Sequence, residues 1–231
     1  MTPFSLVVIT KNAEGHLARC LNSVPFAGEK IVLDSGSTDR TVQIAKECGA
    51  RVYVEEWRGF GRQKRRATEL AQNHWILSLD ADEALGPESQ KELQELMSSP
   101  RLQQADAFAF PRLSFHMGRW IRHGGWYPDW QIRLYDRTRA NWSEGDLHEK
   151  VHARQVFSLS PPILHWVFQD LADQVQTNNR YSTLGSQALQ EKGQSFWLIH
   201  LIVKPWVKFI ECYIWKRGFL DGLPGFVIAV G

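Results

Sequence analysis

The segment of residues 75–83, with the sequence WILSLDADE, most constrains how this chain can fold. Its largely apolar start is long enough for one buried strand, and Asp80, Asp82 and Glu83 then follow within four positions. Because an isolated buried carboxylate is too costly, these acids have to emerge where the strand ends. Open α/β folds bind ligands at this carboxyl edge of the sheet. Asp80 and Asp82 there suit a hard divalent cation that also holds substrate phosphates. A solvated acidic turn is the alternative.

Strand-like and helix-like segments alternate upstream of the acids. Short β-branched, apolar runs over residues 4–10, 30–34 and 51–54 predict buried strands, and apolar residues at helical spacing over 16–24 and 40–48 predict helices between them. We expect Thr38 or Asp39 to cap the second helix. This order predicts an α/β fold with a parallel sheet and right-handed crossovers.

The regular alternation weakens in the second half of the chain. Residues 115–129, rich in Trp, Arg, His and Gly, are predicted to be a loop, and most of the ten tryptophans lie from Trp120 onward. The other expected helices cover 65–73, 87–98, 170–192 and 195–217, and the other expected strands cover 75–79, 105–111, 131–135 and 156–159.

Composition excludes several classes of protein. The formal net charge of +2 and the absence of a sustained basic face argue against a nucleic-acid partner. Three cysteines without a CxxC pair indicate neither a disulfide framework nor a zinc site and favour a reducing compartment. We predict no signal peptide and no membrane-spanning helix, because no basic segment with an apolar core begins the sequence and no long uninterrupted apolar run occurs.

Four segments in order resemble the family-2 inverting glycosyltransferases, which have a Rossmann-like, nucleotide-sugar-binding A-type fold. They are SLVVITKN, IVLDSGSTDRT, LSLDADE, and DWQIRLYDR followed by HEKV. The tail KRGFLDGLPGFVIAV is similar to that of the bacterial lipopolysaccharide core heptose β-1,4-glucosyltransferases. The resemblance implies a catalytic domain over residues 1–165 and a C-terminal helical region over 166–231. It also leads us to expect further residues after Gly231.

The resemblance implies a nucleotide-sugar donor, with UDP-glucose expected. Thr10 and Asn12 would bind the uridine at the first strand end, and Asp34 and Ser35 at the second. A carboxylate such as Asp34 can accept a hydrogen bond from the uracil N–H. The alternative for Asp34 is a turn-forming residue that bonds its own backbone.

The resemblance also implies that Asp80 and Asp82 bracket the diphosphate through Mg²⁺ or Mn²⁺, which would neutralise charge on the leaving group. Asp82 would bind the metal directly, while Asp80 would reach the ribose or a metal-bound water. Glu83 would cap the following helix. His148 and His165 compete for the place of a third metal ligand.

Two cations are expected near the phosphates. Residues 58–66 form a basic segment in which Lys64 holds a position that is functional in the family, whereas Arg65 and Arg66 equally suit a solvated surface. Arg133 is predicted either to bind a phosphate or to form a structural ion pair.

Inverting transfer needs a base that removes a proton from the acceptor hydroxyl. The resemblance places this base at Asp129, immediately before WQIRLY, although Pro128 replaces the glutamate of the usual Glu-Asp pair. Glu149 of the HEKV segment is the alternative.

The C-terminal segment interleaves cations with aromatic residues. On a helix, His200, Lys204, Lys208 and Glu211 share one stripe, and Pro205 is expected to break or kink that helix. This composition favours attachment to a membrane surface, at the cytoplasmic face of a bacterial inner membrane, where a lipid-linked saccharide acceptor is presented. Packing on the sheet or a homo-oligomeric interface is the alternative. An inactive nucleotide-sugar-binding protein and a transferase for another lipid-linked or polyprenyl acceptor remain alternative functions.

Overall fold

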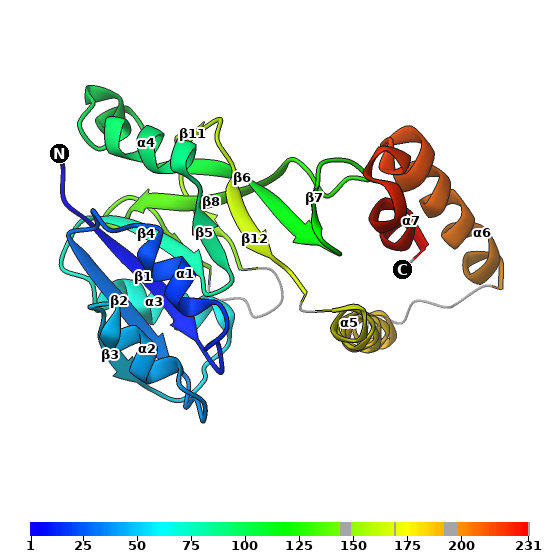
Figure 1. Ribbon diagram of the computed structural model, residues 1–231, viewed down its shortest axis with the longest axis horizontal. Helices are drawn as coiled ribbons and strands as arrows, with labels where there is room; N and C mark the ends of the chain where they lie inside the picture. Colours follow the sequence, from blue (N-terminus) through cyan, green and yellow to red (C-terminus); the bar gives the residue numbers. More distant parts are fainter. Residues whose placement is uncertain (144–148, 169, 192–197, 231) are drawn as a thin grey trace. The chain divides into compact units, whose positions relative to one another are not determined.

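The structure, a computed structural model, describes residues 1–143, 149–168, 170–191 and 198–230 (Figure 1). The described chain divides into two compact units. The first unit contains residues 1–112 and 130–165, and the second contains residues 113–129 and 166–231.

A large mixed sheet with the order β3-β2-β1-β4-β8-β6-β12-β5 organises the first unit. The strands β1, β2, β3 and β4 are parallel, and β8 runs antiparallel to β4 with Leu134 opposite Leu77. In parallel β1 and β4, Ile9 pairs with Asp80, so the acidic strand end lies beside the end of β1. The described strands are β1 (Phe4–Thr10), β2 (Glu29–Asp34), β3 (Arg51–Val54), β4 (Trp75–Asp80), β5 (Glu83–Leu85), β6 (Ala107–His116), β7 (Arg119–Ile121), β8 (Asp129–Asp136), β9 (Asn141–Trp142), β10 (Val151–His152), β11 (Val156–Ser158) and β12 (Ile163–Trp166).

Helices cover both faces of this sheet. Alternate residues of β1 point to opposite faces, so Leu6 packs in one apolar core and Val7 in another. The core around Leu6 includes side chains of α1, α2 and α4, and the core around Val7 includes side chains of α3. The helices of the first unit are α1 (Leu17–Asn22), α2 (Thr41–Glu47), α3 (Phe60–Glu69), α4 (Pro87–Leu96) and the 3-10 helix η1 (Pro100–Gln104).

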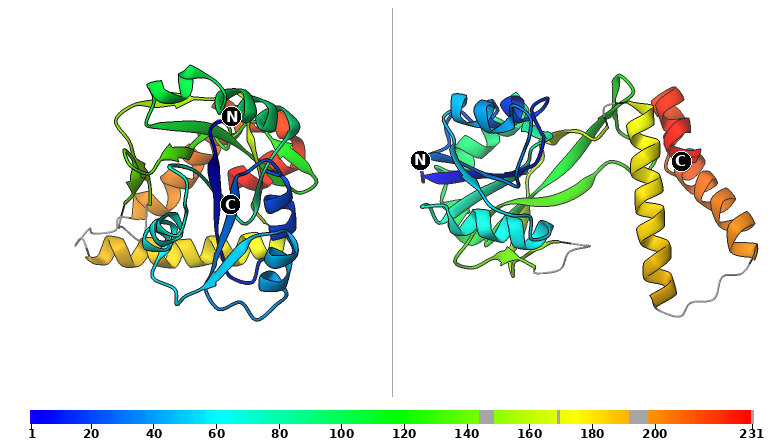
Figure 2. Two further views of the ribbon diagram at one scale, coloured as in Figure 1. Left: turned by 90° about the vertical axis from the view of Figure 1, so that its left-hand side faces the viewer. Right: turned by 90° about the horizontal axis from the view of Figure 1, so that it is seen from below.

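The second unit is largely helical at its C-terminal end (Figure 2). It contains α5 (Leu171–Glu191), α6 (Leu198–Phe209), the π-helical η2 (Ile210–Trp215), the 3-10 helix η3 (Gly218–Asp221) and α7 (Gly222–Val230). Helices α6 and α7 contact each other, and α7 also packs on η3 and on β7. None of the described helices is long and apolar enough to cross a membrane.

Several sequence-based boundaries are wrong. Helix α3 begins at Phe60 rather than residue 65, because Gly59, at φ 90°, turns the chain into the helix. The basic residues after Phe60 that were predicted to precede the helix are therefore part of it. The N-cap of α2 is Arg40, although Asp39 Oδ1 still accepts the Thr41 N–H at 3.0 Å. Residues predicted as a loop include the end of β6 and all of β7, which pair through Ser114 and Ile121.

The C-terminal predictions also need correction. Helix α6 continues through Pro205, so that proline does not break it. A strand that was not predicted, β12, follows residues 156–159 and pairs with β5. The apolar end of the chain, which carries glycine and proline, forms α7, since Pro224 lies in the first turn, where proline is tolerated.

Candidate active site

Two buried cations hold the carboxylate of Asp80 at the end of β4. Lys64, on α3, places its Nζ 2.8 Å from Asp80 Oδ1, and Arg133, on β8, places its Nη2 2.5 Å from Asp80 Oδ2. Both cations are nearly inaccessible to solvent, with 4% and 3% of their surfaces exposed. The antiparallel pairing of β8 with β4 brings Arg133 to this strand end. Of the two expectations for Arg133, the structure therefore supports the ion pair.

Glu83 is a buried anchor of the site and not a helix cap. Its Oε1 lies 2.6 Å from Arg133 Nη2 and 3.6 Å from Arg112 Nη1, and its Oε2 accepts the backbone N–H of Asp80 at 3.0 Å. The α4 N-cap is Gly86, without a side-chain cap. Because a buried charge needs paired and hydrogen-bonded partners, these contacts explain how Glu83 can be 1% exposed. They also fix the turn that presents Asp82.

The close charges shift the protonation equilibria of the site. Burial alone would raise the pKa of the Asp80 carboxyl, but the charges of Arg133 and Lys64 outweigh burial and hold this pKa well below its usual range. Burial likewise opposes the charged form of Arg133, while Asp80 and Glu83 raise the pKa of its guanidinium. Burial, followed by the nearby carboxylates, raises the pKa of the Cys20 thiol, whose Sγ lies 3.5 Å from the Asp80 carbonyl oxygen.

Asp82 and His165 are the described residues that best fit a divalent cation. His165 lies opposite Glu83 in the pairing of β12 with β5, and its Nε2 is 3.5 Å from Asp82 Oδ2. The Asp82 side chain is 37% exposed, so a cation bound to it could take further ligands from solvent or substrate. A cation held by one carboxylate, one imidazole, water and substrate phosphates fits this donor set. Asp80, predicted to reach the ribose or a metal-bound water, is paired with Lys64 and Arg133, and its role toward a metal or donor stays a prediction.

The described residues contain no cluster of three or more His, Cys, Asp or Glu side chains suited to a metal ion. His148, the other predicted metal ligand, lies outside the described residues. The protein part of the donor set that can be described is therefore Asp82 with His165.

The predicted uridine-binding residues lie together at the ends of β1 and β2. Asp34 is fully buried, and Oδ1 accepts hydrogen bonds from Thr10 Oγ1 at 3.0 Å and from Ser37 Oγ. Its Oδ2 accepts the N–H groups of Gly36 at 2.9 Å and Ser37 at 2.8 Å. A carboxylate has about four acceptor sites, and these bonds use them. The geometry supports the turn-forming alternative for Asp34.

Asn12 and Ser35 extend this loop cluster. Asn12, in the left-handed region at φ 51°, accepts the Thr38 N–H through Oδ1 and donates its own N–H to Ser37 Oγ, both at 2.8 Å. Ser35 Oγ accepts Gln63 Nε2 at 3.2 Å, while the buried Gln63 Oε1 has no hydrogen-bond partner. An orphaned buried acceptor beside the predicted uridine site is a candidate to meet a ligand donor.

The two candidate bases lie in different units. Glu149 Oε1 is 3.4 Å from Lys64 Nζ in the first unit, so this glutamate joins the cluster around Asp80. Asp129 is the first residue of β8 and belongs to the second unit. Which of the two removes the acceptor proton stays a prediction.

Sequence reasoning missed Trp142 and underestimated Glu83. Lys64 Nζ lies 4.6 Å from the centre of the Trp142 ring, a cation–π contact. Trp142 Nε1 donates to Tyr135 Oη at 2.9 Å, and burial raises the pKa of Tyr135 to about 12. No periodic signal marks Trp142, because it lies on the two-residue strand β9. The signal for Glu83 was visible, since it follows two acids at a strand end.

A family model described as glycosyl transferase family 2 matches residues 5–161, which include every described site residue above except His165. The chain belongs to glycosyltransferase family 2. An uncharacterized glycosyltransferase of Rickettsia typhi is 30% identical over 241 residues, covering 100% of this chain and 82% of that protein. The lipopolysaccharide core biosynthesis glycosyltransferase LpsC of Rhizobium meliloti is 28% identical over 239 residues, covering 99% of this chain and 87% of that one.

Solved structures confirm the A-type fold of this glycosyltransferase. A crystal structure of TarS 1-349 from S. aureus in complex with UDP-GlcNAc aligns with a TM-score of 0.54 and 15% identity, covering 99% of this chain and 79% of that one. At this identity the similarity shows the fold alone.

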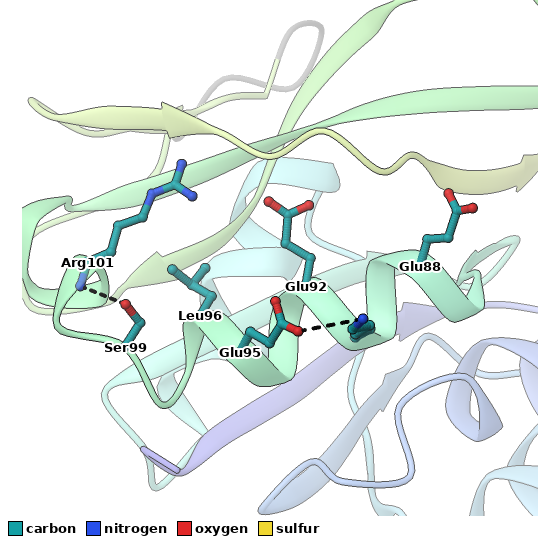
Figure 3. Close-up of a pocket in the computed structure, with 7 residues that line it drawn as sticks. Glu88, Glu92, Glu95, Leu96, Ser99 and Arg101 are labelled. Carbon is teal, nitrogen blue, oxygen red and sulfur yellow. Dashed lines mark hydrogen bonds and ion pairs between the residues drawn. The ribbon is translucent and has the colours of Figure 1, made fainter.

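A pocket of the first unit lies along α4 and η1 (Figure 3). It is lined by Glu88, Glu92 and Glu95 together with Lys91 and Arg101. Lys91 Nζ and Glu95 Oε1 are 4.0 Å apart on the exposed helix surface. This glycosyltransferase therefore has an acidic groove that shares no residue with the Asp80 cluster.

Proposed function

We propose that this glycosyltransferase moves a hexose, glucose from UDP-glucose, onto an inner-core sugar of lipopolysaccharide with inversion at the anomeric carbon. The observation that carries the proposal is the set of charged residues at the end of β4, where Asp82 and His165 face each other beside the Lys64–Asp80–Arg133 ion pairs. The relative named as a lipopolysaccharide core biosynthesis glycosyltransferase supports the acceptor class. The TarS complexes with UDP and UDP-GlcNAc support a UDP-sugar donor.

The loops after β1 and β2 would hold the uridine. Thr10 and Asp34 lock these loops to each other, which leaves Ser35 and the orphaned Gln63 Oε1 available for polar contact with the base or ribose. Asn12 links the same loops and limits their motion. The chain therefore supplies a preformed donor site whose shape is set by its own hydrogen bonds.

Asp82 and His165 would hold a Mg²⁺ or Mn²⁺ ion together with the donor diphosphate. Such an ion neutralises charge that builds on the leaving nucleoside diphosphate. The neighbouring residues position Asp82, because the Glu83 carboxylate accepts the Asp80 backbone N–H and is itself held by Arg133. Lys64 and Arg133 hold the Asp80 carboxylate at the end of β4.

The acceptor hydroxyl would lose its proton to Asp129 or Glu149 as it attacks the face opposite the leaving group. Asp129→Asn is expected to cut turnover by on the order of 10²-fold or more while UDP binding persists. Should Glu149→Gln give that pattern instead, the base is Glu149. Because Glu149 also contacts Lys64, its variant has to be checked for loss of stability by thermal melting.

A membrane surface would present the acceptor to the second unit. Helices α6 and α7 and the segments between them expose many large apolar side chains, and the neighbouring cations suit anionic headgroups. We assign the protein to the cytoplasmic face of the inner membrane as a peripheral enzyme. The exposed apolar residues are Val203, Trp206, Val207, Ile210, Ile214, Trp215, Phe219, Leu220, Leu223, Phe226 and Val230.

Transfer of labelled sugar from a panel of UDP-sugars to delipidated lipopolysaccharide cores of defined truncation tests the proposal. The expected result is Mn²⁺- or Mg²⁺-dependent transfer of glucose to a core that ends at an inner-core sugar, with a β-linked product by proton NMR. Transfer only to polyprenyl-linked acceptors would move the assignment to another lipid-linked substrate. UDP binding without transfer or hydrolysis of any donor would identify an inactive nucleotide-sugar-binding protein.

A further inference from the structure

The second unit contains a pocket of about 490 Å³ between the loop of residues 122–128 and residues 215–217. Sites for small ligands commonly have volumes of roughly 300–1,000 Å³. The lining includes three permanent cations, one histidine and two large aromatic side chains, and none of the described lining residues is acidic. The charged and aromatic lining residues are Arg122, His123, Tyr127, Trp215, Lys216 and Arg217.

Asp221 fixes one wall of this pocket. Its buried carboxylate accepts the backbone N–H groups of Arg122 at 3.0 Å and His123 at 2.8 Å, and it lies 3.1 Å from His123 Nδ1. The backbone oxygen of Asp221 also accepts a hydrogen bond from Arg119 Nη1 at 2.9 Å. Because several bonds converge on one buried acid, the loop that carries Arg122 is held in place before any ligand binds.

The opposite wall is joined to the same loop through Lys216. The Gly124 N–H donates to the Lys216 carbonyl oxygen at 2.9 Å. At Gly125, where φ is +87°, an added Cβ would lie 2.9 Å from Lys216 Cδ, so glycine lets the lysine chain lie across the loop. Lys216 Nζ is 2.5 Å from Glu211 Oε1, which offsets its charge. The excess positive charge of the pocket therefore comes from Arg122 and Arg217.

The remaining lining suits a ring-shaped ligand. Trp215 leaves 72% of its surface exposed, so its ring is accessible to a ligand in the pocket. Tyr127 lies on the same pocket, and the Arg122 guanidinium is 6.0 Å from the centre of its ring. Guanidinium groups bind phosphate and carboxylate with paired hydrogen bonds, and an aromatic face can pack on the apolar face of a sugar ring.

We propose that this pocket binds the anionic group of an acidic saccharide, a sugar that carries a phosphate or a carboxylate, and thereby recognises the acceptor. Identifying the bound sugar as the acceptor rests on the proposed function. The proposed binding site itself does not depend on that function. The groove along α4 provides a contrast within the same chain, because three glutamates line it (Figure 3). An anion is expected to avoid that groove, so Arg101 there is a matched position for a control.

Isothermal titration calorimetry on the full chain with glucose 6-phosphate, glucose and inorganic phosphate tests the inference. We expect glucose 6-phosphate to bind more tightly than inorganic phosphate, and glucose to give no measurable heat. Arg122→Gln and Arg217→Gln should each weaken glucose 6-phosphate binding about tenfold or more, as loss of a charge-assisted hydrogen bond predicts. Arg101→Gln should leave it unchanged. Circular dichroism checks that each variant is folded.

Three outcomes would overturn the inference. The first is that glucose 6-phosphate does not bind, and the second is that its affinity is the same in all the variants. The third is that inorganic phosphate binds as tightly as glucose 6-phosphate, which would mean that the sugar ring is not recognised. Vesicles of phosphatidylglycerol provide a further experiment. Loss of vesicle binding in Arg217→Gln without any binding of glucose 6-phosphate would assign the pocket to lipid headgroups.

UDP binding is measured in parallel. Binding of glucose 6-phosphate without binding of UDP would support the saccharide site and contradict the proposed function. Binding of UDP without binding of glucose 6-phosphate would support the proposed function and contradict the saccharide site.

Discussion

In the first unit, Lys64 and Arg133 are buried against the carboxylates of Asp80 and Glu83, whereas in the second unit Arg122 and Arg217 are exposed on a pocket without an acidic lining. The difference separates two uses of positive charge. A cation that the chain's own acids have neutralised fixes geometry and stability, but it has little attraction left for a ligand. A cation held at a rigid surface keeps its attraction for anions. The predictions below test this contrast.

The largest effect is expected from breaking the buried ion pairs. Arg133→Met leaves Asp80 and Glu83 without their shared partner, and removing one member of a buried pair costs roughly 3–5 kcal/mol. The free energy of unfolding from urea titration should fall by that amount. The matched control is Lys91→Met, which breaks an exposed i,i+4 pair with Glu95 and should cost less than about 0.5 kcal/mol. Equal losses in the two variants would remove the distinction between buried and exposed cations.

Asp82→Asn should reduce sugar transfer by on the order of 10²-fold or more, because a ligand of the diphosphate-bound cation contributes several kcal/mol to the transition state. The unfolding free energy should change little, since the Asp82 side chain is 37% exposed. Rates are measured over a range of Mn²⁺ concentrations, with Glu88→Gln on the α4 groove as the control. Full activity of Asp82→Asn, or of the wild type in EDTA, would contradict the metal role.

The exposed lysines of α6 test whether surface cations of the second unit attract an anionic membrane. Each lysine near an anionic membrane contributes about 1 kcal/mol, so Lys204→Glu with Lys208→Glu should release most of the protein from anionic vesicles in a sedimentation assay. Neither residue lines the pocket that contains Arg217. Activity on a soluble, delipidated acceptor should stay near the wild-type value. Equal loss on soluble and membrane-embedded acceptors would mean that α6 is part of the folded core.

The smallest effect concerns acid stability. Because the cations lower the pKa of Asp80 in the folded chain, the stability from its ionised form is fully present above its unfolded pKa of about 3.9. That contribution is lost as the pH falls further, toward the folded pKa. The urea midpoint should therefore fall between about pH 4 and pH 2, and less steeply in Asp80→Asn. Identical slopes in the two proteins would show that Asp80 is not the titrating group.

The position of the acids at a strand end was predictable because it depends on short local patterns. An apolar run followed by acids specifies both a strand and its polar end, and the parallel pairing of β1 with β4 places Asp80 beside the end of β1. The partner of each charge was not predictable. Arg133 could bind a phosphate or a carboxylate, and only the register of β8 against β4 brings it to Asp80.

The second unit was harder to predict for a physical reason. Its pocket joins residues 122–128 to residues 215–217, which are far apart in the sequence and have no shared periodicity. Asp221 illustrates the problem, since its role depends on backbone N–H groups about 100 positions earlier in the chain. Short-range patterns carry no signal for such contacts. The α6 region was predicted as amphipathic and charged, but the change to π-helical bonding at Ile210 was not.

The most direct test of the account is calorimetric binding of UDP in the presence of Mg²⁺ to the wild type, to Asp82→Asn and to Arg217→Gln. The account predicts that the wild type binds UDP, that Asp82→Asn loses most of this affinity, and that Arg217→Gln retains it. That result would assign the donor to the strand ends of the first unit and leave the exposed cations of the second unit for another ligand. Unchanged UDP binding by Asp82→Asn, or equal loss by Arg217→Gln, would contradict the account.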